Sequence, residues 1–160
     1  MTVTKTQYGT AAQALTITLD ALANTSGSTG RQSAVVDNAA AAFLDALVQV
    51  SIVSGASGVS GTGTVEVYAY GSVDDGTSYS DGLTGSDAAA TLTSPPNLVR
   101  LGTINVVAAA TTYRSKLMSV AAAFGGILPA KWGIAVLNKS GAALGTGCSA
   151  QYQGVTLQTA

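Results

Sequence analysis

The sequence has 160 residues, of which only 9% are charged and none is histidine, and its formal net charge is -1. Soluble domains usually carry about a quarter charged residues, so this chain depends on hydroxyl groups and glycine for much of its polar surface. The composition excludes Ser-His-Asp and Cys-His catalysis and imidazole metal sites, and it provides no cluster of cations for nucleic acid. We therefore expect a structural protein, not an enzyme, with no cofactor and no nucleic-acid partner.

The length is that of one domain with one core. Apolar stretches are interrupted before the roughly 20 residues needed to span a bilayer, so no membrane segment is expected. The first nine residues contain one lysine and no apolar run, which is unlike a secretory signal and favours synthesis in the cytoplasm. The single cysteine, Cys148, cannot form an internal disulfide.

The N-terminal part contains an arm, a strand and a loop. Residues 1–12 are expected to form an arm outside the main domain, which we place at 13–160. Residues 13–19 read QALTITL, and apolar side chains at every second position are typical of a strand. The small polar residues of 24–32 predict an exposed loop.

Two strands are predicted next. Residues 39–42 could begin a helix, but 43–53 alternate as one long strand. After a Gly/Ser loop, 64–70 reads TVEVYAY and is the clearest strand of the chain, with its core face formed by Val65, Val67 and Ala69. Its opposite face carries Glu66, Tyr68 and Tyr70. This row could be exposed, could meet a neighbouring subunit, or could make ordinary cross-strand contacts.

A long loop is predicted at 71–96, rich in Gly, Asp, Ser and Thr and closed by two prolines that exclude a central strand. Loops of this length are usually functional or flexible. Its segment 74–82 offers carboxylate and hydroxyl oxygens that suit Ca²⁺, but the spacing is not that of an EF-hand, and Asp-Gly pairs also favour turns. We therefore expect no metal.

The remaining strands are predicted at 98–107, with a bulge near Gly102, and at 111–120, where Tyr113, Ser115 and Leu117 share one face. Two more follow at 132–138 and 148–157. The total is about eight strands joined by loops, which predicts an all-β fold, a single antiparallel β-sandwich.

Other chemistry is scarce. Cys148 lies in an alternating strand, which indicates a small buried side chain more than a reactive thiolate. Half of the acidic residues lie in the one polar loop, so paired carboxylates for glycoside hydrolysis are not indicated. Tyrosines and Trp132 could stack on sugar rings, although a tryptophan in an apolar strand usually belongs to a core.

Three stretches of the chain resemble small virion proteins of tailed bacteriophages. They are TVEVYAYGSVDDGTSYSDG at 64–82, FGGILPAKWGIAVLNKSGAAL at 124–144 and SAQYQGVTLQ at 149–158. With LTITL at 15–19, the resemblance covers most of the chain. It implies a jelly-roll-like sandwich, often assembled as a trimer.

The resemblance implies a capsid decoration or cement protein on the virion surface, with the major capsid protein as partner. A collar, tail or fibre component is the alternative within the same group. A free carbohydrate-binding module is the alternative from another class. Low charge suits extensive contacts, and an isolated subunit is expected to self-associate. The arm and the long loop are the expected contact regions, with candidate interface residues Tyr8, Tyr68, Tyr70, Asp75, Tyr79 and Asp81.

Overall fold

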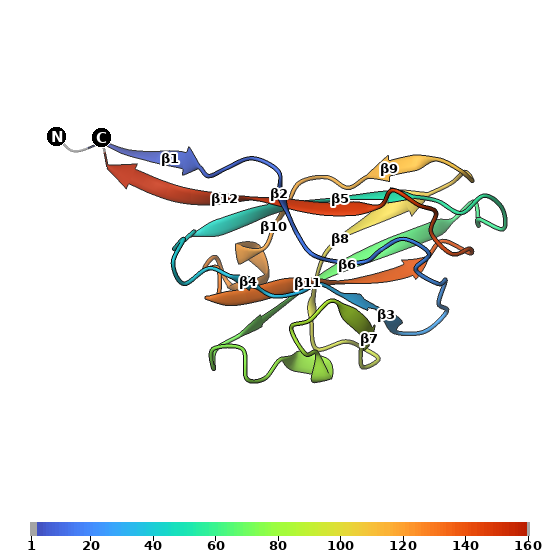
Figure 1. Ribbon diagram of the computed structural model, residues 1–160, viewed down its shortest axis with the longest axis horizontal. Coiled ribbons are helices and arrows are strands. Elements are labelled where there is room, and N and C mark those ends of the chain that lie inside the picture. The colour runs from blue at the N-terminus through green and yellow to red at the C-terminus, as the bar shows by residue number, and fades with distance from the viewer. Residues whose placement is uncertain (1–2, 160) are drawn as a thin grey trace.

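The computed structural model describes residues 3–159, which form two antiparallel β-sheets packed face to face (Figure 1). Sheet A contains β1 (Thr4–Tyr8), β2 (Gln13–Ala14), β5 (Asp45–Val53), β9 (Thr112–Arg114), β10 (Met118–Ser119) and β12 (Ser149–Thr159). Sheet B contains β3 (Thr29–Gln32), β4 (Val36–Asp37), β6 (Gly63–Ser72), β7 (Ala88–Thr91), β8 (Val99–Val106) and β11 (Lys131–Lys139). Two short 3-10 helices complete the described elements, η1 (Ser80–Gly82) and η2 (Ala121–Phe124). No helix among these residues is long and apolar enough to cross a membrane.

The short strands lie in tandem along shared edges. β1 and β2 both pair with β12, β9 and β10 both pair with β5, and β3 and β4 both pair with β11. If each tandem pair is counted as one strand position and β7 is left out, the chain has eight positions, which we number 1 to 8 in sequence order. Their order in space is 1-8-3-6 in sheet A and 2-7-4-5 in sheet B. That order is a jelly roll. The expected antiparallel sandwich of about eight strands is therefore confirmed, with β7 added at the edge of sheet B.

The core lies between the sheets and consists of side chains at alternate strand positions. On β5 the fully buried residues are Ala46, Val48, Val50 and Ile52. On the facing strands they are Val65 and Val67 of β6 and Trp132, Ile134 and Val136 of β11. Burying each large aliphatic side chain contributes about 1.5–3 kcal/mol, so this alternation is the main source of stability.

Strand 111–120 differs from the expectation because a bulge divides it. Arg114 pairs with Ser51 on β5, but Met118 pairs with Val48, so the register with β5 shifts by one residue between them. The extra residue reverses the alternation, so Leu117 is 61% exposed and Met118 is buried. The expectation that Leu117 shares a face with the residues before the bulge is wrong. The bulge predicted near Gly102 is confirmed between β6 and β8.

Three local expectations about the N-terminal third are also corrected. Of the strand predicted at 13–19, only the first two residues pair with β12; the rest crosses from sheet A to sheet B, although its Leu15 and Leu19 are buried. The loop predicted at 24–32 ends in β3, which the polar composition concealed. Residues 39–42 form a turn and not a helix, because the Asn38 side chain bonds both the N–H and the carbonyl of Phe43.

The N-terminal arm is ordered as a strand. β1 pairs with the end of β12 along its whole length, with Tyr8 opposite Val155 and Thr4 opposite Thr159. β12 leaves β5 at Val155, so its last four residues pair with β1 alone. The two strands therefore form a ribbon that projects beyond the rest of the sandwich (Figure 1). Of the arm expected at 1–12, residues 4–8 therefore form a strand of sheet A, and residues 1 and 2 lie outside the described residues.

Candidate interaction surface

The outer face of sheet B is covered by the chain's own long loop. Residues 71–96 include η1 and β7, and they fold back across the sheet instead of extending into solvent (Figure 1). A second apolar cluster forms beneath them from Tyr68, Tyr70, Leu83, Leu92 and Leu137. The loop therefore completes the domain with its inner side, while residues 73–75 stay exposed, and its expected role as a contact region stays a prediction.

Polar contacts hold the loop in place. The Gln32 side chain lies under it and bonds Thr84. Asp87 accepts hydrogen bonds from Arg31 at 2.6 Å and from the hydroxyl of Thr18 at 2.6 Å. Burial alone would raise the pKa of Asp87, but the Arg31 and Thr18 donors lower it to about 2. The carboxylate therefore joins the loop, β3 and the crossing segment.

The outer face of sheet A has no such cover. Outward-facing residues on β5 and β12 form cross-strand pairs, with Gln49 opposite Gln151 and Leu47 opposite Gln153. Two of these glutamines bond the irregular edges: Gln49 donates to the carbonyl of Ser115 at 3.1 Å, and Gln153 donates to the carbonyl of Gly9 at 3.0 Å. The result is a surface of amide, hydroxyl and aliphatic groups.

One cation lies on this surface. Arg114 is exposed on β9 and forms no ion pair with any residue in 3–159. It lines a shallow hollow of 360 Å³ together with Gln49, Ser51, Ser149 and Gln151. An unpaired guanidinium among amides and hydroxyls is suited to a carboxylate or a row of carbonyl groups on a partner. We define the sheet A surface as Leu47, Gln49, Ser51, Arg114, Leu117, Ser149, Gln151 and Gln153.

The structure separates the six residues that were expected to form an interface. Tyr68 and Tyr70 are buried beneath the loop, so neither ring is available to a partner. The Tyr70 hydroxyl donates to the carbonyl of Ser33 at 2.7 Å, and its ring meets Tyr79 edge-on with centroids 5.2 Å apart. Ordinary intramolecular packing, one of the alternatives for this row, is what the structure contains.

The other expected interface residues are dispersed. Tyr8 is 57% exposed on the ribbon, and Asp75 is exposed beside Lys131, 3.5 Å from its ammonium nitrogen. Asp81 accepts hydrogen bonds from Thr93 and Asn97 within the loop. The sheet A surface was missed, although the outward glutamines that alternate with buried residues on β5 and β12 could have indicated it.

The acidic residues of the loop point to different donors. Asp74 is bonded by the hydroxyls of Ser72 and Ser78, and these bonds lower its pKa to about 2. Asp81 lies with Asn97 and Thr93 elsewhere in the loop. Within residues 3–159 no three acidic or cysteine side chains converge as metal ligands would.

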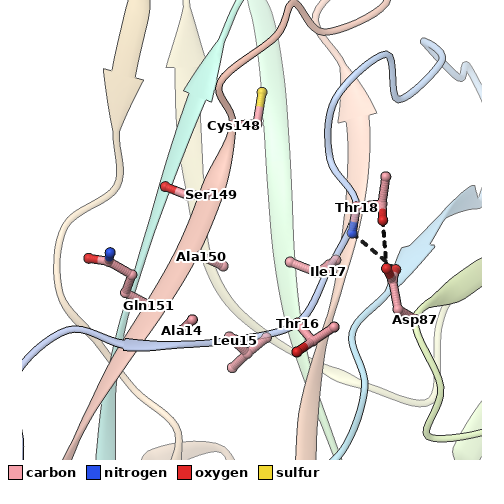
Figure 2. A pocket seen from close by; sticks show the side chains of 10 residues that line it. All are labelled: Ala14, Leu15, Thr16, Ile17, Thr18, Asp87, Cys148, Ser149, Ala150 and Gln151. Atoms are coloured by element: carbon pink, nitrogen blue, oxygen red, sulfur yellow. Dashed lines mark hydrogen bonds between the residues drawn. The ribbon is translucent and has the colours of Figure 1, made fainter.

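A second hollow lies where the chain crosses between the sheets (Figure 2). It is lined by residues 14–18 and 148–151, with Asp87 bonded to Thr18 at one side and Cys148 at a separate position. Burial raises the pKa of Cys148, which keeps it a thiol, and its sulfur accepts a hydrogen bond from the Val53 N–H. Cys148 was expected to be buried, and the structure shows it half-buried.

Comparisons with protein-family models, with curated proteins and with solved structures found no match. Function is therefore inferred from the chain's own geometry and chemistry. Of the four aromatic residues considered for a sugar-binding platform, Tyr68 and Tyr70 are buried, Trp132 lies in the core, and Tyr79 is half-buried against Tyr70.

Proposed function

We propose that this protein is a structural component of a bacteriophage virion, a capsid decoration protein that binds the major capsid protein through the sheet A surface. The observation that carries the proposal is the difference between the two sheets. The chain covers the outer face of sheet B with its own loop and leaves the outer face of sheet A bare. The jelly-roll order and the resemblance in the sequence support the same role.

The chemistry of the surface suits binding to a repeated lattice. Glutamine amides and hydroxyls can pair with backbone groups of a partner, and their desolvation costs less than that of charged side chains. Arg114 supplies one charged contact that can select an acidic or carbonyl-rich partner surface. Weak contacts of this kind reach high avidity when many copies bind neighbouring subunits.

The location in the particle is tested by cryo-electron microscopy of virions from the source, with mass spectrometry to confirm that the chain is present. Density at repeated positions over the capsid lattice, with sheet A toward the shell, is the expected result. Density at the portal or tail would favour the collar, tail or fibre alternative. Absence from the particle would overturn both.

The surface is tested by matched charge substitutions. Arg114→Gln removes the unpaired guanidinium, and we expect at least about tenfold weaker binding to particles stripped of this protein, since bonds to charged groups contribute about 1.5–3 kcal/mol. Arg100→Gln removes a guanidinium from β8 of sheet B, away from the surface, and should bind as the unmodified protein does. Equal affinity of the Arg114→Gln variant would contradict the assigned surface.

A further inference from the structure

The outer edge of β1 in the β1–β12 ribbon is unpaired within residues 3–159. β1 pairs with β12 on one side, and no described strand pairs with its other side. All five residues of β1 are exposed, and the strand contains no proline and no bulge, so that Lys5 is its one residue of a kind that usually protects an edge. A two-stranded ribbon alone in water is marginally stable, so this one gains from a further strand.

The hydrogen-bond pattern determines which groups of β1 are free. Gly9 N–H donates to Gly154 O at 2.8 Å, so this is a hydrogen-bonded pair of the ladder. Because such pairs alternate in antiparallel strands, Lys5 and Gln7 direct their main-chain groups toward β12. Thr4, Thr6 and Tyr8 direct theirs away from it.

The two faces of the ribbon also differ. Tyr8, Thr6, Val155 and Leu157 lie on one face, which continues the outer face of sheet A. Tyr8 is 57% and Leu157 58% exposed. The opposite face carries Lys5, Gln7, Thr156 and Gln158. A strand added to the edge must match this alternation.

We propose that β1 of a second copy adds antiparallel to this edge and forms a symmetric dimer. With the twofold axis at Thr6, Thr6 lies opposite its own copy, Thr4 lies opposite Tyr8 of the other copy, and all three outward residues form hydrogen-bonded pairs. Lys5 then lies opposite Gln7. A register centred on Lys5 would place two like charges directly opposite each other, and one centred on Gln7 would leave Thr4 unpaired.

The projection of the ribbon makes this pairing sterically accessible. The last four residues of β12 extend about 14 Å beyond β5 together with their partners on β1 (Figure 1). Antiparallel addition of a second copy places the two sandwiches at opposite ends of the joined ribbons. Sheet A then continues from one copy into the other. The dimer follows from the ribbon alone and does not depend on the virion role.

The oligomeric state of the purified full chain tests the proposal by analytical ultracentrifugation over a range of concentrations. We expect twice the monomer mass. Thr6→Pro removes an outward N–H and spares the bonds to β12, so it should give a monomer with unchanged circular dichroism, whereas Thr6→Val keeps the amide and should remain a dimer. A monomer or a trimer of the unmodified chain would overturn the proposal.

A cysteine scan in a Cys148→Ala background tests the register. Thr6→Cys places two sulfurs across the twofold axis, where a Cα separation near 5.5 Å permits a disulfide, so oxidation should give a covalent dimer on a non-reducing gel. Thr4→Cys separates the two sulfurs by about 13 Å and should stay monomeric on the same gel. Cross-linking at position 4 as readily as at 6, or at neither, would overturn the register.

Discussion

Tyr70 lies across Gly133, its partner on the neighbouring strand, and this pair joins the loop cluster to sheet B. Tyr70 on β6 is opposite Gly133 on β11, and a Cβ added to the glycine would overlap the tyrosine ring. The ring is held from above by Tyr79 and at its hydroxyl by the carbonyl of Ser33. Because Gly133 has no side chain, the ring of Tyr70 occupies the space beside it.

Gly133→Ala should destabilise the protein by about 1–3 kcal/mol, because the ring must move out of a well-packed site. Urea unfolding measures the change. The matched control is Gly61→Ala, where an added Cβ meets nothing within 4 Å, and it should leave stability within about 0.5 kcal/mol. Similar effects of both substitutions would show that the contact with Tyr70 is not what matters.

Asp87 makes the free energy of unfolding depend on pH in the acid range. Its folded pKa is about 2 against an ordinary value of 3.8, so the folded state binds this proton less readily than the unfolded chain. The stabilisation is complete above about pH 4 and is lost as the pH falls toward about 2. Solvent screening limits its size to about 1 kcal/mol.

Asp87→Asn should lower the free energy of unfolding by about 1 kcal/mol at pH 7 and reduce the loss of stability between pH 4 and 2. Urea unfolding at a series of pH values measures both effects. Asp75→Asn, at an exposed carboxylate, serves as the control with little expected effect at pH 7. A variant as acid-sensitive as the unmodified protein would assign the acid dependence to other groups.

At the scale of the elements, bulges decide which side chains face the core. The break between β9 and β10 shifts their pairing with β5 by one residue and turns Met118 inward. The break between β3 and β4 likewise shifts their pairing with β11 by one residue, whereas the break between β1 and β2 shifts their pairing with β12 by two residues. These breaks also create the edge irregularities that Gln49 and Gln153 bond from the sheet A surface.

The bulge makes adjacent residues differ sharply in their contribution. Met118→Ala should cost about 2–4 kcal/mol, because it empties a buried site beside Val48, whereas Leu117→Ala should change stability by less than about 0.5 kcal/mol. Thermal or urea unfolding of the two variants checks this. A larger loss of stability in Leu117→Ala than in Met118→Ala would contradict the bulge, because it would mean that Leu117 faces the core.

At the scale of the whole molecule, one core joins both sheets. Trp132 is the single tryptophan, is fully buried in β11 of sheet B, and meets Tyr152 of sheet A edge-on with ring centroids 5.3 Å apart. The first and last strands of the chain also pair with each other. Such a structure is expected to unfold as one cooperative unit.

Unfolding in urea should therefore give coincident transitions by Trp132 fluorescence and by far-ultraviolet circular dichroism. Folding is expected to take milliseconds to seconds, because the paired strands are distant in the sequence. Stopped-flow fluorescence measures the rate. Separate midpoints for the two probes would mean that the sheets, or the loop that covers sheet B, unfold independently.

The sequence by itself determined the class of fold and much of the core. Alternation at 43–53, 64–70 and 132–138 is a local property with a period of two, so it predicted which side chains are buried. The strand count predicted a sandwich, and the absence of histidine removed whole classes of chemistry.

Only the tertiary structure decided what the surfaces are. A bulge shifts the register by one residue without a change in composition, so Leu117 and Met118 could not be assigned from alternation alone. Whether Tyr68 and Tyr70 meet solvent depends on a loop that packs from elsewhere in the chain. For the same reason, the bare outer face of sheet A and the free edge of β1 become visible only when distant segments are placed together.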